Sequence, residues 1–313
     1  MDWLNTLWLG RSKRAETTLL QGNIADFLMS ERGLSENGSG EAVTFHDPLL
    51  MRDMDRAVTR ISRALASEEL IFIHGDYDVD GISSTALLSL FLRRAGARVE
   101  TYIPNRLDEG YGLKANGVDE AIRAGARLLI TVDCGIRSLD EVAQLQEQGV
   151  DTIITDHHEP GQTLPAALAV VDPHRHDGSY PFVGLAGAGV ALKLCQALAA
   201  HLELEPASLR ELLALAALGT IADVMQLTGE NRAIVKAGLA EMRRGALPGI
   251  SELLKAAGTD MPAITAKALA FRVSPRLNAA GRMGDASAAL ALLSSQNAAE
   301  SRTLALQLEE KNT

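Results

Sequence analysis

The chain has little of what marks a secreted or membrane protein. Its two cysteines, Cys134 and Cys195, lie far apart and show no CxxC or zinc-type spacing, which favours a reducing compartment over a disulfide framework. No apolar run approaches the length of a membrane span, and the first residues lack the order of a signal peptide. These absences predict a cytoplasmic protein that has no membrane partner.

Basic charge and aromatic side chains are also scarce. The net charge is -10 and aromatic residues make up 4% of the chain. Because phosphate contacts are made by clustered Lys and Arg, this composition argues against a protein that wraps broadly around nucleic acid. A narrow site remains open, since metal ions bound by acidic residues carry positive charge of their own. With 313 residues, of which 47% are hydrophobic, the chain can form one large domain or two.

Three aspartates follow an apolar run of strand length near residue 70. The run ends in His-Gly, then come Asp76, Asp78 and Asp80, and after Gly81 the pattern becomes helical. Three carboxylates in one partly buried loop require cations to offset their charge. Oxygen-rich sites of this kind suit Mg or Mn, so the first hypothesis is a metal site.

Two other interpretations fit parts of the same loop. An EF-hand calcium loop begins with the same Asp spacing, but it needs a Glu at its twelfth position, where this chain has Leu87. The element before the loop also has the character of a strand and not of a helix. A solvated acidic turn is the other interpretation, and it does not predict the His and Asp residues that follow later strands.

Beyond residue 68 the sequence alternates between strand and helix patterns. We predict strands at about 70–74, 98–103, 128–132, 151–155 and 168–172, helices between them at about 82–95, 115–124 and 138–148, and an earlier helix at 51–66. This rhythm predicts an α/β fold with a parallel sheet flanked by helices. Ligands of such open sheets bind beyond the carboxyl ends of the strands, so chemistry is expected in the residues that follow each strand.

Polar residues gather at those strand ends. His74 and the three aspartates follow the first strand and Asp133 follows the third, while Asp156, His157 and His158 follow the fourth. Carboxylates mixed with imidazoles are typical ligands of Mn or Mg pairs. The arrangement predicts that these side chains meet at one edge of the sheet and bind metal.

Six stretches in order carry a resemblance to a known family: GDYDVDG at 75–81, PNRLDEGYGL at 104–113, TVDCG at 131–135, TDHH at 155–158, GTIADVMQL at 219–227 and SPRLNAAGRMGDA at 274–286. Together they resemble the RecJ single-strand-specific DNA exonucleases of the DHH phosphoesterase superfamily. DHH alone occurs often by chance, but six stretches in one order do not. The resemblance covers nearly the whole chain.

The resemblance implies a two-metal site that uses Mn or Mg. Its implied ligands are Asp78, Asp80, Asp133, His157 and Asp223, with Asp133 bridging the ions, and His74 and Asp76 are candidates for the remaining place. His158 would position water or the leaving group, so Asp133 and His158 are the implied catalytic residues. By position alone, Asp223 fits equally well as the cap of the apolar helix before it.

Two further stretches have a structural and a functional interpretation. Arg276, Asn278 and Arg282 are either part of a solvated loop or, as the resemblance implies, groups that hold the DNA backbone. The stretch GLAGAG at 184–189 lacks the dinucleotide spacing and is interpreted as a tight turn with close helix packing. Because the chain contains no P-loop, its phosphate chemistry is not expected to depend on ATP.

The resemblance implies 5' to 3' hydrolysis of single-stranded DNA to 5'-mononucleotides, in DNA repair and recombination. Single-strand-binding protein and a RecQ-type helicase are candidate partners. We predict an N-terminal extension and helix at 1–68, a DHH catalytic α/β domain at 69–230 and a helical segment at 231–313 that leads toward a second, DHHA1-type domain. That domain's glycine-rich motif and the OB-type fold of RecJ chains are not found, so the chain is interpreted as a truncated catalytic core.

Two alternatives belong to other functional classes. One is a smaller DHH phosphoesterase that acts on nanoRNA, cyclic dinucleotides or pyrophosphate, against which the stretches at 104–113 and 274–286 argue. The other is a non-catalytic replication scaffold. A scaffold is expected to have lost metal ligands, whereas all the implied ligands are present here.

Overall fold

The computed structural model describes residues 45–106, 108–282 and 286–312. Its strands form one five-stranded parallel sheet: β1 (Leu70–His74), β2 (Arg98–Tyr102), β3 (Leu128–Val132), β4 (Asp151–Thr155) and β5 (Ala169–Val171). The helices between them are α5 (Val79–Arg94), α6 (Ala115–Ala124) and α7 (Leu139–Glu147), and α4 (Met54–Ala66) precedes the sheet. The predicted α/β fold is confirmed, and the strands lie within two residues of their predicted bounds.

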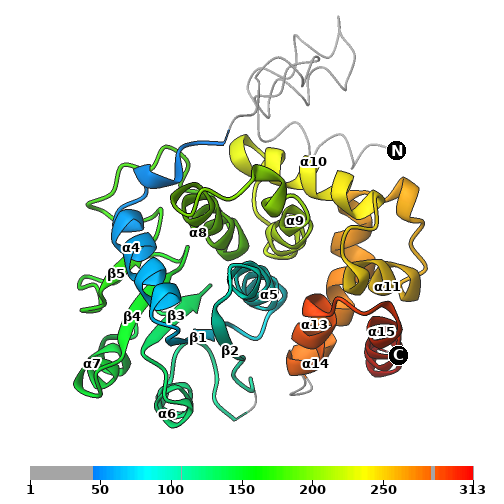
Figure 1. Ribbon diagram of the computed structural model, residues 1–313. Coiled ribbons are helices and arrows are strands. Elements are labelled where there is room, and N and C mark those ends of the chain that lie inside the picture. Colours follow the sequence, from blue (N-terminus) through cyan, green and yellow to red (C-terminus); the bar gives the residue numbers. More distant parts are fainter. Residues whose placement is uncertain (1–44, 107, 283–285, 313) are drawn as a thin grey trace, which may run out of the picture. The chain divides into compact units, whose positions relative to one another are not determined.

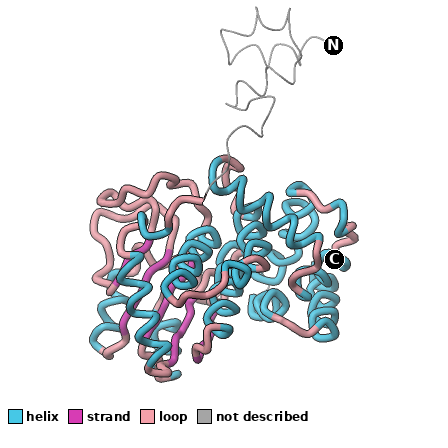
Figure 2. The backbone as a smooth tube through the Cα atoms, turned by 45° about the horizontal axis from the view of Figure 1, so that its top comes forward, coloured by secondary structure: helices cyan, strands magenta, loops and turns pink. Residues whose placement is uncertain are grey.

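Helices cover both faces of the sheet because the strands are apolar on both sides (Figures 1 and 2). Alternate residues of β1 face opposite ways. Ile71 and Ile73 pack in a core with α4, α5 and a later helix, α8 (Gly187–His201), whereas Phe72 packs in a second core with Val118 of α6 and Leu145 of α7. The sheet is therefore a rigid middle layer, which fixes the loops at its carboxyl edge.

The strand order is β2-β1-β3-β4-β5. From β1 the chain goes outward to β2 and then returns to β3 on the other side of β1, so the order reverses between β1 and β3. In open parallel sheets ligands bind at such a reversal, beyond the carboxyl ends of the two strands. The loops that follow β1 and β3 are the ones that carry the aspartate triplet and Asp133.

Helices form the remainder of the described chain. They are α8 (Gly187–His201), α9 (Leu212–Ala222), α10 (Gly229–Arg243), α11 (Pro248–Ala256), α12 (Ala266–Ala268), the π-helical η4 (Leu269–Val273), α13 (Ser274–Arg282), α14 (Ala286–Ser294) and α15 (Ala298–Asn312), with 3-10 turns η1 (Pro48–Leu50), η2 (Pro206–Leu209) and η3 (Met261–Ala263). The predicted helical segment after the sheet is confirmed. Helix α9 is buried on most sides between α5, α8 and α10, as its nearly uniform apolar sequence requires.

In the described part of the chain, no helix is both long enough and apolar enough to cross a membrane. The predicted division into three segments stays a prediction, and most of the predicted segment 1–68 lies outside the described residues.

Candidate metal centre

The loop after β1 places two aspartates at the start of α5. Asp78 is the N-cap, and its carboxylate accepts a hydrogen bond from the backbone N–H of Gly81 at 2.9 Å. Asp80 lies in the first turn and is buried. Its two oxygens accept hydrogen bonds from the backbone N–H groups of Gly187, at 2.7 Å, and Ala188, at 2.9 Å. The first turn of α8 therefore fixes the Asp80 carboxylate, as the partial positive charge of a helix N-terminus favours.

Asp133 directly follows β3 and is buried. Its backbone has a left-handed conformation with φ 61°, which aspartate tolerates better than most residues. The carboxylate lies against Gly187, where an added Cβ would come within 2.5 Å of Asp133 Oδ1. A residue larger than glycine at 187 would displace this carboxylate, so the GLAGAG stretch has a role beyond the predicted tight turn and helix packing.

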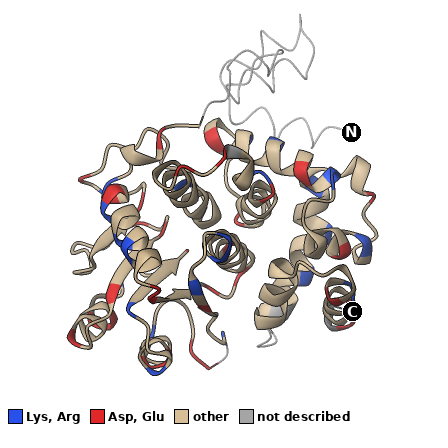
Figure 3. Cartoon of the chain, in the orientation of Figure 1, with Lys and Arg blue, Asp and Glu red and all other residues tan. Residues whose placement is uncertain are grey.

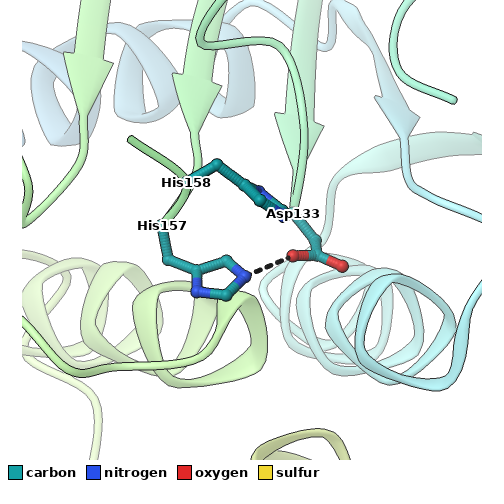
Figure 4. A group of neighbouring side chains, drawn as sticks. All are labelled: Asp133, His157 and His158. Carbon is teal, nitrogen blue, oxygen red and sulfur yellow. Dashed lines mark ion pairs between the residues drawn. The ribbon is translucent and has the colours of Figure 1, made fainter. Parts of the chain in front are cut away.

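His157 follows β4 and points at three carboxylates. Its Nε2 lies 3.0 Å from Asp133 Oδ1, 3.7 Å from Asp223 Oδ2 and 3.8 Å from Asp80 Oδ2. Figure 4 shows the imidazole directed at the Asp133 carboxylate, at the carboxyl ends of the strands. The backbone of Leu185 hydrogen-bonds the ring of His157. Because Nε2 faces the carboxylates, Nδ1 makes the hydrogen bond with Leu185. Nε2 therefore keeps a free lone pair.

His158 is held by different partners. Its Nδ1 lies 2.7 Å from Asp156 Oδ1, and the hydroxyl of Tyr111 lies 3.0 Å from the same nitrogen. Asp156 is fully buried and also accepts hydrogen bonds from the backbone N–H groups of His157 and of Ile136. Asp156 therefore shapes the loop and orients His158. His157, the next residue, faces the carboxylates of the cluster.

Three groups of side chains have ligand atoms that lie within 4.8 Å of one another: Asp133, His157 and His158; Asp80, His157 and Asp223; Asp76, Asp78 and Asp133. Every predicted metal ligand except His74 belongs to one of them. Asp223 is the C-cap of α9, so the structure gives it the cap position and also brings its carboxylate to the cluster. Asp133 and His157 each belong to two of these groups.

Crowding of buried carboxylates raises their pKa values. Burial, followed by repulsion from Asp78, raises the pKa of Asp76 to about 7 and that of Asp223 to about 6. Burial and the charges of neighbouring carboxylates raise the pKa of both Asp80 and Asp133 well above the usual range. Burial lowers the pKa of His157 to about 4, so its ring is neutral at pH 7. The protein thus brings together carboxyl groups whose ionised forms need a cation nearby.

His74 is buried at the end of β1 and lies outside the three groups of ligand atoms. Its ring is 5.4 Å from that of Tyr102, and its Nδ1 lies 3.7 Å from the thiol of Cys134. Burial lowers the pKa of His74 to about 4. Asp76 and His74 are the two candidates for the remaining ligand place, and the structure brings Asp76 into one of the groups but His74 into none of them.

The predicted DNA-contacting residues lie on α13, whose Gly281 packs against the backbone of Tyr77 in the aspartate loop. Arg276 makes an ion pair with Glu309 of α15, with 2.9 Å between Nη2 and Oε1. Asn278 is half-buried, and Arg282 is the last residue of α13. Figure 3 shows acidic and basic residues interspersed over the helices of the described chain. Arg276 therefore already joins two helices, whatever it contributes to DNA binding.

Tyr111 and Gly187 escaped the predicted site, whereas Asp156 was expected at this edge of the sheet and contacts His158 there, outside the three groups of ligand atoms. Asp156 carried a usable signal, because it follows β4 directly and begins the Asp-His-His run. Tyr111 and Gly187 act through contacts with residues far along the chain, which no local pattern indicates.

Comparison with known proteins identifies the class of this fold and site. Residues 70–220 match the model of the DHH family, N-terminal domain. This part of the chain is therefore similar to the N-terminal domain of the DHH family.

Within that class the similarity is to RecJ. The chain is 42% identical over 268 residues to the single-stranded-DNA-specific exonuclease RecJ of Bacillus subtilis, covering 86% of this chain and 33% of the relative. It is 41% identical over 270 residues to the RecJ of Escherichia coli, covering 83% and 47%. The chain thus spans between a third and half of the length of these curated relatives. The resemblance to RecJ that the sequence motifs indicated is confirmed.

Solved structures agree with this result. A crystal structure of an exonuclease RecJ bound to manganese matches with a TM-score of 0.78 and 42% identity, over 84% of this chain and 66% of that one. A RecJ from Thermus thermophilus in complex with Mn²⁺ matches with a TM-score of 0.77 and 38% identity, over 91% and 41%. Another structure of the Thermus protein holds Mg²⁺.

Proposed function

We propose that the chain is the catalytic part of a RecJ-like, metal-dependent exonuclease that hydrolyses single-stranded DNA from the 5' end and releases 5'-mononucleotides in DNA repair and recombination. One observation carries the proposal. His157 Nε2 and Asp133 Oδ1 lie 3.0 Å apart, yet Asp133 Oδ1 accepts no hydrogen bond. Two lone pairs at this distance repel each other unless a proton or a cation lies between them.

The donor set fits a pair of divalent ions, Mn or Mg. Five residues would hold them, namely Asp78, Asp80, Asp133, His157 and Asp223, with Asp76 completing the set. Asp76 Oδ1 is another buried oxygen without a hydrogen-bond partner. Bound ions would activate water and offset the charge of the phosphate ester.

The chain's own groups supply orientation and proton transfer. Asp156 orients the imidazole of His158, and Tyr111 donates a hydrogen bond to the backbone carbonyl of Asp133 at 3.3 Å. His158 is the exposed imidazole of the pair, so it is the one that can reach a substrate oxygen. We assign to it the proton transfer to the departing oxygen.

The test compares Asp133→Asn with the parent chain in metal binding and in Mn²⁺-dependent cleavage of a 5'-ended single strand. Asparagine keeps the shape and tolerates the left-handed backbone at 133, so the fold is expected to persist while metal occupancy and cleavage are lost. Asp119→Asn, at an exposed position of α6, is the matched control. If Asp133→Asn still binds two ions and cleaves, the assignment of the centre is wrong.

Substrate length separates this function from that of a smaller DHH phosphoesterase. We expect a long 5'-ended strand to be cleaved in preference to a di- or trinucleotide, and the opposite preference would favour the smaller enzyme. A cytoplasmic location, single-strand-binding protein and a RecQ-type helicase as partners complete the proposal. The location is supported by the two free, buried cysteines.

A further inference from the structure

Asn231, the third residue of α10, is fully buried and joins two segments of the chain. Its Nδ2 donates hydrogen bonds to the backbone carbonyl of Gly184, at 2.6 Å, and to that of Gln226, at 3.1 Å. Because both partners are acceptors, the amide nitrogen and not its oxygen must face them, which fixes the orientation of the side chain. One amide group therefore links the segment that leads into α8 to the segment that follows α9.

The segment that leads into α8 holds two of the proposed metal ligands. The backbone of Leu185, the residue after Gly184, hydrogen-bonds the ring of His157. The backbone N–H of Gly187, at the start of α8, donates to the Asp80 carboxylate at 2.7 Å. A movement of this segment would therefore change the position of both side chains.

The segment that follows α9 carries Asp223, the C-cap of that helix, and its backbone is strained. The next residue, Val224, has φ 57°, a conformation that is rare for a β-branched residue and is commonly taken by glycine at the end of a helix. Val224 is 87% exposed, so packing of its side chain does not offset the strain. The hydrogen bond from Asn231 to Gln226 holds the segment two residues further on. It therefore stabilises the backbone that directs Asp223 to the centre.

The groups of ligand atoms differ in whether they depend on these two segments. We call Asp80, His157 and Asp223 the Asp223 group, and Asp76, Asp78 and Asp133 the Asp76 group. Each member of the Asp223 group lies in, or is hydrogen-bonded by, a segment that Asn231 joins. In the Asp76 group, Asp78 caps α5, and the backbone N–H of Asp133 donates to the carbonyl of Thr155 at 3.0 Å. Helix α5 and the sheet therefore fix the backbone of the Asp76 group.

We propose that Asn231 is a positioning residue, whose amide holds the Asp223 group together and thereby sets the affinity for one of the two proposed ions. This inference rests on the proposed function for the presence of two ions. Loss of the amide would leave two buried carbonyls unpaired and would let the two segments move separately. The ligand atoms of the Asp223 group would then no longer be held within 4.8 Å of one another. Residues that hold the ligands of a metal commonly change its affinity in this way.

Titration calorimetry with Mn²⁺ tests this on the parent and on Asn231→Ala, with the melting temperature measured in EDTA. We expect the parent to bind two ions, and Asn231→Ala to lose about tenfold or more in affinity for one of them while it binds the other as before. Asp223→Asn is expected to weaken the same ion, so the two changes together should cause less than the sum of their separate losses. Val235→Ala, at a buried position one turn further along α10, is the matched control. It should lower the melting temperature and leave both affinities unchanged.

Two more variants keep the test decisive. Asn231→Ser retains one donor and replaces the alanine variant if that one does not fold, and it is expected to show the same selectivity with a smaller loss. Val224→Gly relieves the strain, because glycine adopts the left-handed backbone freely. Added to Asn231→Ala, it is expected to restore part of the lost affinity, whereas alone it should bind both ions as the parent does.

Equal affinities of the parent and Asn231→Ala for both ions would overturn the inference. So would an equal loss at both ions, an equal loss in Val235→Ala or no recovery with Val224→Gly, because Asn231 would then act only through the stability of α10. A parent that binds no Mn²⁺ would overturn both this inference and the proposed function. If the chain cleaves no DNA but its ion affinities show this selectivity, the proposed function fails and the inference stands.

Discussion

The carboxylate of Asp80 is bound by the backbone of Gly187, 107 residues further along the chain, at 2.7 Å. The same carboxylate lies against α9, where a Cβ added to Gly219 would come within 2.3 Å of Asp80 Oδ1. Two helices that are remote in sequence therefore fix one carboxylate. The geometry of the centre depends on glycines as much as on its acidic residues.

Gly187→Ala is expected to damage the centre without unfolding the chain. The new methyl group would meet Asp133 Oδ1 at 2.5 Å and force that carboxylate to move, while alanine is otherwise favourable in a helix. We expect Mn²⁺ affinity to fall by tenfold or more with circular dichroism unchanged. Titration calorimetry with Mn²⁺ measures the affinity.

Gly184→Ala is the control for that variant. Its added Cβ would find only the ring of Phe182, at 3.6 Å, which is ordinary contact distance. Unchanged Mn²⁺ affinity in Gly187→Ala would show that Asp133 is not held where metal binds.

Metal binding is expected to strengthen steeply between pH 5.5 and 8. A ligand must lose its proton to bind metal, and the carboxyls of Asp76 and Asp223 have pKa values raised to about 7 and about 6. His157, whose pKa is lowered to about 4, is already neutral over this range. The competing protons therefore come from the carboxyl groups and not from the imidazole.

Calorimetry in buffers of different ionisation enthalpy counts the protons released on Mn²⁺ binding. At pH 6 we expect Asp223→Asn to release fewer protons than the parent. A Mn²⁺ affinity independent of pH between 5.5 and 8 would contradict this account of the carboxyl groups.

Asp172 is expected to make stability fall as pH rises. This buried residue follows β5, and burial raises its pKa to about 8 from the ordinary aspartate value of 3.8. Between these two values the unfolded chain has released the proton that the folded chain retains, so the folded state loses stability as pH rises through this window. This loss of folding stability is complete above pH 8 and absent below pH 4.

Asp172→Asn removes this titration and keeps an oxygen for the backbone N–H of His174, which Asp172 Oδ1 binds at 2.7 Å. The difference in melting temperature between variant and parent is expected to shift in favour of the variant by a few degrees from pH 5 to pH 8, measured in EDTA. Asp119→Asn should show no such shift. A constant difference across this range would mean that Asp172 is ionised in the folded chain.

The sequence was sufficient to predict the sheet and the residues that gather at its carboxyl edge, and their role as metal ligands stays a prediction. The predicted strands are apolar on both faces and alternate with amphipathic helices, and few arrangements other than a parallel sheet fit this pattern. Parallel strands bring the residues that follow β1, β3 and β4 to one edge of the sheet. Asp80, Asp133 and His157 were predictable for this reason. Asp223 lies at the end of a helix, outside this rule, so only its family motif indicated it.

The remainder depends on contacts between distant segments. Gly187 matters because α8 begins beside Asp80 and Asp133, and Tyr111 because its loop crosses to His158. The ion pair of Arg276 with Glu309 depends on how α13 meets α15. Strand and helix periodicity does not encode these approaches, which are set by how the helices pack.

The last prediction concerns the strength of DNA binding. Single-strand binding combines a basic groove with stacking surfaces, and this chain has a net charge of -10 and 4% aromatic residues. It also spans 47% of its Escherichia coli relative. We expect the chain to bind long single-stranded DNA more weakly than a full-length RecJ and to cleave it without processivity, because contacts remote from the reacting phosphate hold the strand between cleavages.

Fluorescence anisotropy with a labelled single strand, for this chain and for a full-length RecJ at several salt concentrations, measures that difference. Each lost phosphate contact lowers the salt dependence of binding, so the slope of log affinity against log salt is expected to be shallower for this chain. Cleavage of a dinucleotide, which needs few remote contacts, is expected to differ less between the two proteins than cleavage of a long strand. Equal affinity and equal slope would contradict this prediction and would show that these 313 residues already contain the whole binding surface.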